Sequence, residues 1–172
     1  MIRSLMHHLV GTISVIFYFL NTVLWATPII ILSFFKLIPL APWRRFISYI
    51  LDACATAWIT INNLNQRVSS RTKWDVTGLD QLTRDDWYLV IANHQSWVDI
   101  LVLQRVFNRK IPFLKFFLKK ELIYVPMLGL AWWALDFPFM SRYSKSFLAK
   151  NPHLKGKDME TTHKACEKFQ TK

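Results

Sequence analysis

The chain has 172 residues, of which 52% are hydrophobic and 15% aromatic, and its formal net charge is +11. This length suits one domain of ordinary size, and the apolar share, with only 4 Gly and 7 Pro, argues against a disordered or low-complexity chain. The positive charge indicates an anionic partner, either nucleic acid or an acidic lipid surface, although a generally solvated basic surface would give the same count.

The two cysteines give no sign of a metal site or of a disulfide framework. Cys54 and Cys166 are far apart in the sequence and belong to no Cys-x-x-Cys or Cys/His cluster. We therefore expect free thiols in a reducing compartment.

The apolar residues are concentrated near the N-terminus. Residues 9–35 carry no formal charge, and as one helix they would rise about 40 Å, more than the roughly 30 Å of hydrocarbon in a bilayer. Pro28 lies inside this run and Asn21 near its middle, so a kinked, tilted span and two shorter helices dipping into one leaflet both fit. We expect residues 1–42 to be a membrane-anchoring leader and residues 43–172 to be a separate domain.

The distribution of charge predicts the location of that domain. Lys36, Arg44 and Arg45 outweigh Arg3 at the other end of the apolar run, which by the positive-inside rule places the body of the protein on the cytoplasmic side. We expect membrane phospholipids as the partner. The sequence contains no helix-turn-helix, zinc-finger or RNA-binding aromatic signature, so no nucleic-acid partner is expected.

Beyond the leader, the pattern of residues predicts an α/β fold. Residues 43–64 read as an amphipathic helix whose apolar face would lie either in a core or on the membrane surface, and this face is formed by Phe46, Ile50, Ala53, Ala57 and Ile61. Further helices are expected over residues 96–107 and 159–170. Strands are expected over residues 74–78, 87–92, 111–117 and 137–140, with 87–92 as the strongest candidate for a buried strand.

The candidate catalytic residues come directly after the apolar run 87–92. His94 there could act as a general base, and Asp99 could reach back to one ring nitrogen and fix the tautomer of the imidazole. A lone histidine near a carboxylate is more often structural, so the residues alone leave both interpretations open. Two possible ligands are too few for a metal site, and no metal is expected.

The surrounding motifs resemble those of the lysophospholipid and glycerol-phosphate acyltransferase family, which includes bacterial 1-acylglycerol-3-phosphate acyltransferases. Asn93-His94-Gln95-Ser96-Trp97-Val98-Asp99 is similar to the family's first block, in which a His-x-x-x-x-Asp motif follows an apolar strand. Phe137-Pro138-Phe139-Met140-Ser141-Arg142 resembles a second block that ends in a phosphate-binding arginine. Between the two blocks, Lys119-Lys120-Glu121-Leu122, Pro126 and Gly129 follow in the family's order.

This resemblance implies the transfer of a fatty acyl group from acyl-CoA or acyl carrier protein to the hydroxyl of a lysophospholipid such as 1-acylglycerol-3-phosphate, with no cofactor. His94 would be the general base, Asp99 would orient it, and Arg142 would hold the acceptor phosphate. Lys119 and Lys120 would contribute to substrate binding. The other basic residues nearby could attract anionic lipid or donor phosphates, or could simply be solvated; they are Arg105, Arg109, Lys110 and Lys115. The alternative from another class is a non-enzymatic, basic membrane-surface protein.

One family motif is missing from the sequence. The third block, a Glu-Gly-Thr-Arg signature that follows an apolar strand, has no counterpart after Arg142. We therefore expect the chain to be an N-terminal portion of an acyltransferase in which His94 and Asp99 are kept but the site around them is incomplete.

This expectation predicts little or no acyl transfer by purified membranes that contain the chain. The assay supplies acyl-CoA and 1-acylglycerol-3-phosphate and follows formation of the diacyl product. Turnover that disappears on His94→Ala would contradict the expectation.

Overall fold

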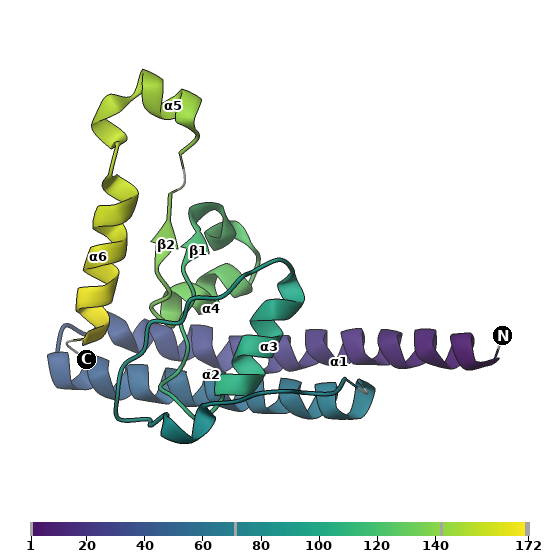
Figure 1. Ribbon diagram of the computed structural model, residues 1–172. Helices are drawn as coiled ribbons and strands as arrows, with labels where there is room; N and C mark the ends of the chain where they lie inside the picture. Colours follow the sequence, from purple (N-terminus) through teal and green to yellow (C-terminus); the bar gives the residue numbers. More distant parts are fainter. Residues whose placement is uncertain (1, 71, 142, 171–172) are drawn as a thin grey trace. The chain divides into compact units, whose positions relative to one another are not determined.

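The computed structural model of the protein describes residues 2–70, 72–141 and 143–170, most of which are helical. They form two compact units, residues 1–114 and residues 115–172. The helices and strands are labelled in Figure 1 in chain order. We describe each unit by itself.

The first unit is built on two long helices, α1 (Ile2–Ser33) and α2 (Ala41–Ser69), which the short helix η1 (Phe34–Leu37) connects. The helix α1 continues through Pro28 without a break, so the charge-free run 9–35 forms one helix as far as Ser33. The segment Leu5–Leu37, with a mean hydropathy of 2.0, is long and apolar enough to cross a membrane. Most of its large apolar side chains are exposed, so α1 is not the buried core helix of this unit.

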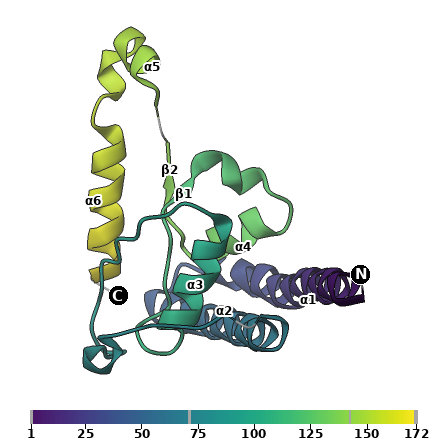
Figure 2. The same cartoon turned by 45° about the vertical axis from the view of Figure 1, so that its right-hand side comes forward.

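The helices α1 and α2 run antiparallel, side by side, as Figures 1 and 2 show from two directions. Five polar side chains, which we call the polar seam, set the register between them. Asn21 Nδ2 donates to Asn62 Oδ1 over 2.8 Å, and Asn65 Nδ2 donates to Ser14 Oγ over 2.9 Å. Ser14 also bonds to Ser69, the fifth member, over 3.3 Å. Asn21 and Asn62 are 5% and 2% exposed, so their hydrogen bond is shielded from solvent.

Toward η1 the buried residues of both helices become apolar; they include Ala26, Ile29, Ile47, Leu51 and Ala55. The amphipathic helix predicted for residues 43–64 is thus present, but its buried face differs from the predicted one. The packed face follows Ile47, Leu51 and Ala55, whereas Phe46 of the predicted face is exposed. Successive residues of a helix are about 100° apart around its axis. A face predicted one position too early therefore points about 100° away from the face that is buried.

The next helix, α3 (Trp97–Phe107), is fixed to α2 through its C-terminal half. Asn108, at its C-cap, donates to Thr60 Oγ1 over 3.0 Å, and Arg105 donates to Gln66 Oε1 over 3.4 Å. The guanidinium of Arg105 also lies 4.2 Å from the centre of the Trp74 ring, a cation–π contact. All of these contacts are made by the C-terminal half of α3, so its N-terminal end takes no part in them.

The predicted strands 74–78 and 87–92 do not form. Within residues 72–96, the short helix η2 (Leu79–Gln81) is the one helix or strand that the structure describes, and no described residue pairs with this segment as a sheet partner. In the segment 87–92, Trp87, Leu89 and Ile91 are exposed, Ile91 to 89%. The run is apolar, as predicted, but a strand also needs a neighbour to pair with its backbone hydrogen-bonding groups.

The second unit retains a short α/β element. Strands β1 (Leu118–Lys119) and β2 (Phe139–Met140) pair in parallel, with Leu118 opposite Phe139. The connection between them contains the short helix η3 (Lys120–Tyr124) and the helix α4 (Leu128–Ala134). The α/β prediction is therefore only weakly supported: β2 lies within the predicted strand 137–140, whereas β1 begins just after the predicted strand 111–117.

The remaining helices of the second unit are α5 (Lys145–Lys150), the short η4 (Pro152–Leu154) and α6 (Lys157–Gln170), and α6 includes the predicted helix 159–170. An ion pair of 3.3 Å between Lys168 of α6 and Asp136 connects α6 to the turn before β2. The division into a leader of residues 1–42 and a domain of residues 43–172 stays a prediction.

The hydrogen bond between Asn21 and Asn62 yields a prediction about stability. Asn62→Leu removes one of the two acceptors of the buried Asn21 amide, the other being the carbonyl of Trp58, and is expected to destabilise the first unit by about 1–3 kcal/mol. Asn21→Leu/Asn62→Leu removes both polar groups and should recover most of the loss. Urea unfolding in mild detergent, followed by helical circular dichroism, measures both. A double variant no more stable than the single one would show that the loss does not arise from the unpaired amide of Asn21.

Gly129 of α4 yields a second prediction. A Cβ at this position would overlap the backbone carbonyl of Ile123 in η3, so Gly129→Ala forces the two helices apart and is expected to cost about 1–3 kcal/mol. Gly11→Ala in α1 is the matched control, because nothing lies within 4 Å of its Cβ. Thermal unfolding should show a lower midpoint for Gly129→Ala only.

Candidate active site

The chain turns sharply where the apolar run 87–92 meets α3. The backbone N–H of His94 donates to the carbonyl of Ala92 over 2.9 Å, which closes a three-residue turn. Ser96 follows in an extended conformation and is the N-cap of α3. His94 is thereby held just outside the helix, and Asp99 lies in its first turn.

The structure brings His94 and Asp99 together, as the sequence predicted. His94 Nδ1 lies 3.3 Å from Asp99 Oδ2, and the two side chains are 53% and 34% exposed. The other ring nitrogen, Nε2, lies across the imidazole from this contact. A neutral His94 whose Nδ1–H faces Asp99 has an unprotonated Nε2, which is the form that a general base requires.

Two backbone groups hold the carboxylate of Asp99 in place. The N–H groups of Gln95 and Ser96 donate to Asp99 Oδ2 over 2.6 Å and 2.7 Å. In return, Ser96 Oγ accepts a hydrogen bond of 3.3 Å from the N–H of Val98, which completes a capping box at the start of α3. The carboxylate is also well placed against the positive end of the helix dipole.

These contacts keep Asp99 ionised. The backbone hydrogen bonds from Ser96 and Gln95 are the largest causes that lower the pKa of Asp99, and the nearby His94 adds to them. Because the folded-state pKa is below the ordinary value, the stabilisation is present above that ordinary value and is lost as the pH falls through the lowered one. At neutral pH Asp99 is therefore an anion that can orient and stabilise His94.

The other predicted site residues belong to the second unit. Lys119 in β1 and Lys120 at the start of η3 are both exposed, so they can reach an anionic ligand. Arg142 lies outside the described residues. Two basic residues near the motifs are engaged in packing: Arg105 lies on Trp74, and Lys115 donates to the carbonyl of Leu135 over 2.8 Å.

Two further residues complete the description of this region. Trp97, the first residue of α3, is 73% exposed. Sequence reasoning missed Ser96, although Ser96-Trp97-Val98-Asp99 before an apolar helix is a recognised Ser-x-x-Asp signature of a helix N-terminus.

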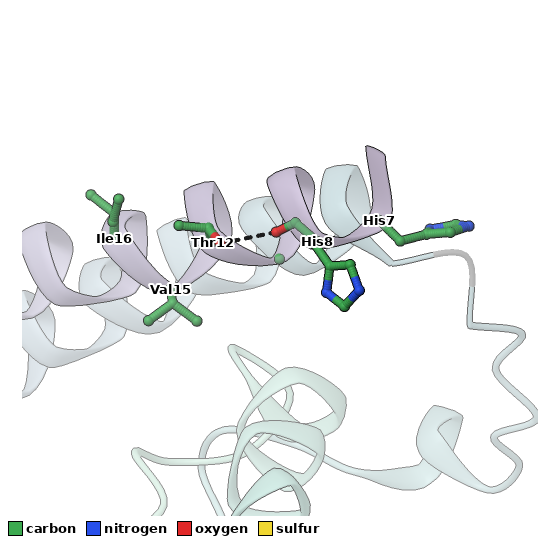
Figure 3. A pocket seen from close by; sticks show the side chains of 6 residues that line it. His7, His8, Thr12, Val15 and Ile16 are labelled. Carbon is green, nitrogen blue, oxygen red and sulfur yellow. Dashed lines mark hydrogen bonds between the residues drawn. The ribbon is translucent and has the colours of Figure 1, made fainter. Parts of the chain in front are cut away.

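A hollow of about 420 Å³ lies elsewhere, on α1. Its lining residues come from one face of that helix, and Figure 3 shows His7 and His8 among them, with the Thr12 hydroxyl bonded to the carbonyl of His8. None of the predicted catalytic residues lines it. Among the described residues no group of three or more His, Cys, Asp or Glu could hold a metal ion.

Comparisons with known proteins agree with the motifs. A family model described as Acyltransferase matches residues 73–171, more than half of the chain, and this range includes the His94–Asp99 pair. A search of curated proteins and a search of solved structures found no match. On the strength of the family match, the chain belongs to the acyltransferase family.

Proposed function

We propose that the His94–Asp99 site belongs to an enzyme that transfers a fatty acyl group from acyl-CoA or acyl carrier protein to the free hydroxyl of a lysophospholipid in phospholipid biosynthesis or remodelling. We favour 1-acylglycerol-3-phosphate as the acceptor. The observation that carries this proposal is the contact of 3.3 Å between His94 Nδ1 and Asp99 Oδ2 inside the matched family region.

In the proposed reaction His94 Nε2 takes the proton of the acceptor hydroxyl as its oxygen attacks the thioester carbonyl of the donor. Asp99 stabilises the imidazolium that results. The tetrahedral intermediate then collapses, the carbon–sulfur bond breaks, and the thiolate takes the proton back from His94. An ester and a free thiol are formed, with no acyl-enzyme intermediate.

The basic residues supply the recognition of phosphate in this proposal. Lys119 and Lys120, both exposed, are proposed to bind anionic groups of the substrates as point charges. Arg142, from its place in the sequence motif, is proposed to bind the acceptor phosphate in a bidentate manner. Holding the phosphate at a distance from the reacting atoms would place the hydroxyl for attack.

The proposed location is the cytoplasmic side of a bacterial inner membrane. The segment Leu5–Leu37 supports an association with the bilayer through its length and composition. A membrane-associated enzyme would meet a lysophospholipid acceptor where that lipid resides.

The proposal predicts that the acceptor hydroxyl approaches His94. The full chain, with ¹⁵N-labelled histidine and reconstituted in lipid nanodiscs, is titrated with 1-acylglycerol-3-phosphate while the ring nitrogen resonances are followed by NMR. We expect the His94 signals to shift on binding, because Nε2 accepts a hydrogen bond from the hydroxyl. The exposed His153 in the same spectrum is the internal control and should not respond.

An analogue that lacks the hydroxyl, 1-acyl-propanediol-3-phosphate, separates the chemistry from simple lipid binding. It keeps the phosphate and the acyl chain, so it should bind without moving the Nε2 resonance of His94. Equal shifts with both ligands, or none with either, would contradict the role of His94 as general base.

A further inference from the structure

Three donors meet at a single oxygen of Asp99. The backbone N–H groups of Gln95 and Ser96 lie 2.6 Å and 2.7 Å from Oδ2, and His94 Nδ1 lies 3.3 Å from the same atom. The two backbone bonds are shorter than the contact with the imidazole. The position of the carboxylate is therefore set mainly by the backbone at the start of α3.

That backbone depends on Ser96. As the N-cap, Ser96 is extended, with φ −144° and ψ 154°, and this conformation directs its N–H toward Asp99. The Ser96 hydroxyl stabilises the same conformation, because Oγ accepts the otherwise unpaired N–H of Val98 over 3.3 Å. Removing the hydroxyl would loosen the turn that supplies both backbone donors to Asp99.

We propose that Ser96 is a positioning residue for acyl transfer, which holds the Asp99 carboxylate against His94 through the capping box of α3. This inference rests on the proposed function of His94 as general base. Ser96 touches neither the substrate nor the imidazole in this role. It acts through Asp99, and the consequence is that one hydroxyl both starts a helix and selects the tautomer of the catalytic base.

The tautomer of His94 is the property to measure, because a general loss of stability would not change it selectively. With Asp99 in place, neutral His94 carries its proton on Nδ1. Without this acceptor, the proton is free to move to Nε2, the nitrogen that the reaction needs unprotonated. The ¹⁵N shifts of the two ring nitrogens distinguish these forms.

The experiment uses the full chain in nanodiscs, with ¹⁵N-labelled histidine, at about pH 8.5, where histidines are neutral. The His94 signals are assigned from their loss in His94→Gln. For Ser96→Ala we expect the ratio of the Nδ1–H to the Nε2–H form to fall about fivefold. This factor corresponds to the free energy that is usually lost when an N-cap side chain is removed. Ser96→Thr, which keeps a capping hydroxyl, should retain the original ratio.

Ser144→Ala is the matched control. Ser144 is the N-cap of α5 and accepts from the N–H of Phe147 over 3.2 Å, so the variant loses an equivalent hydrogen bond far along the sequence from His94. Its His94 signals should match those of the original chain. Far-UV circular dichroism of all variants checks that the helices remain.

Asp99→Ala separates the two possible failures. If Asp99→Ala changes the tautomer but Ser96→Ala does not, the inference about Ser96 is wrong and the His94–Asp99 pair stands. If Asp99→Ala leaves the tautomer unchanged, Asp99 does not orient His94, and the proposed function loses the observation that carries it.

Discussion

The hydrogen-bonded register between α1 and α2 is the constraint on which the first unit depends. The polar seam aligns the two helices, and α2 then offers Thr60 and Gln66 to the C-terminal half of α3. Because α3 is fixed at that end, its N-terminal end has a defined position. The position of the candidate active site therefore depends on the α1–α2 hairpin, to which α3 connects it.

At the polar seam, the distribution of polarity in this hairpin differs from that in a soluble helical pair. Amide and hydroxyl side chains lie between the helices, while large apolar side chains of α1, such as Leu9 and Phe19, face outward. In hydrocarbon a polar group needs a partner within the protein, and hydrogen bonds between helices provide one. Hydrogen bonds within the hairpin thus pair part of these polar groups, including Asn21 Nδ2 with Asn62 Oδ1, and the exposed apolar side chains of α1 give an exterior suited to lipid. Such an exterior fits an enzyme whose proposed acceptor is itself a lipid.

The sequence predicted best those features that depend on neighbouring residues. The charge-free run 9–35 predicted either one helix or two, and the structure has one, α1. Helical periodicity predicted α2 and α3, and the position of His94 just before α3 predicted its contact with Asp99. The face of α2 that packs in the structure lies one position away from the predicted one: it follows Ile47, Leu51 and Ala55 and continues to the polar Asn62. No hydrophobic pattern reveals that Asn62 is buried against Asn21.

The strands were predicted less well for a physical reason. The residues of 87–92 have high β-propensity, but propensity describes how a residue fits a sheet and does not supply the neighbouring strand. In the second unit the partner of β1 is β2, about twenty residues away along the chain, and the crossover helix α4 fits only because Gly129 lets it approach η3. Such pairings between distant segments are not encoded in a local pattern.

The separation between His94 and Asp99 follows from the geometry of a helix start. Asp99 is the third residue inside α3, where a side chain points back over the first turn and can reach the N–H of the N-cap, Ser96. The residue two before the N-cap is His94, so a carboxylate that caps the helix is automatically brought beside the imidazole. A carboxylate at position 98 or 100 would be rotated by about 100° around the helix and would lose both the cap and the histidine. The spacing of this motif is therefore the one at which a single carboxylate oxygen can stabilise the helix and orient the base at the same time.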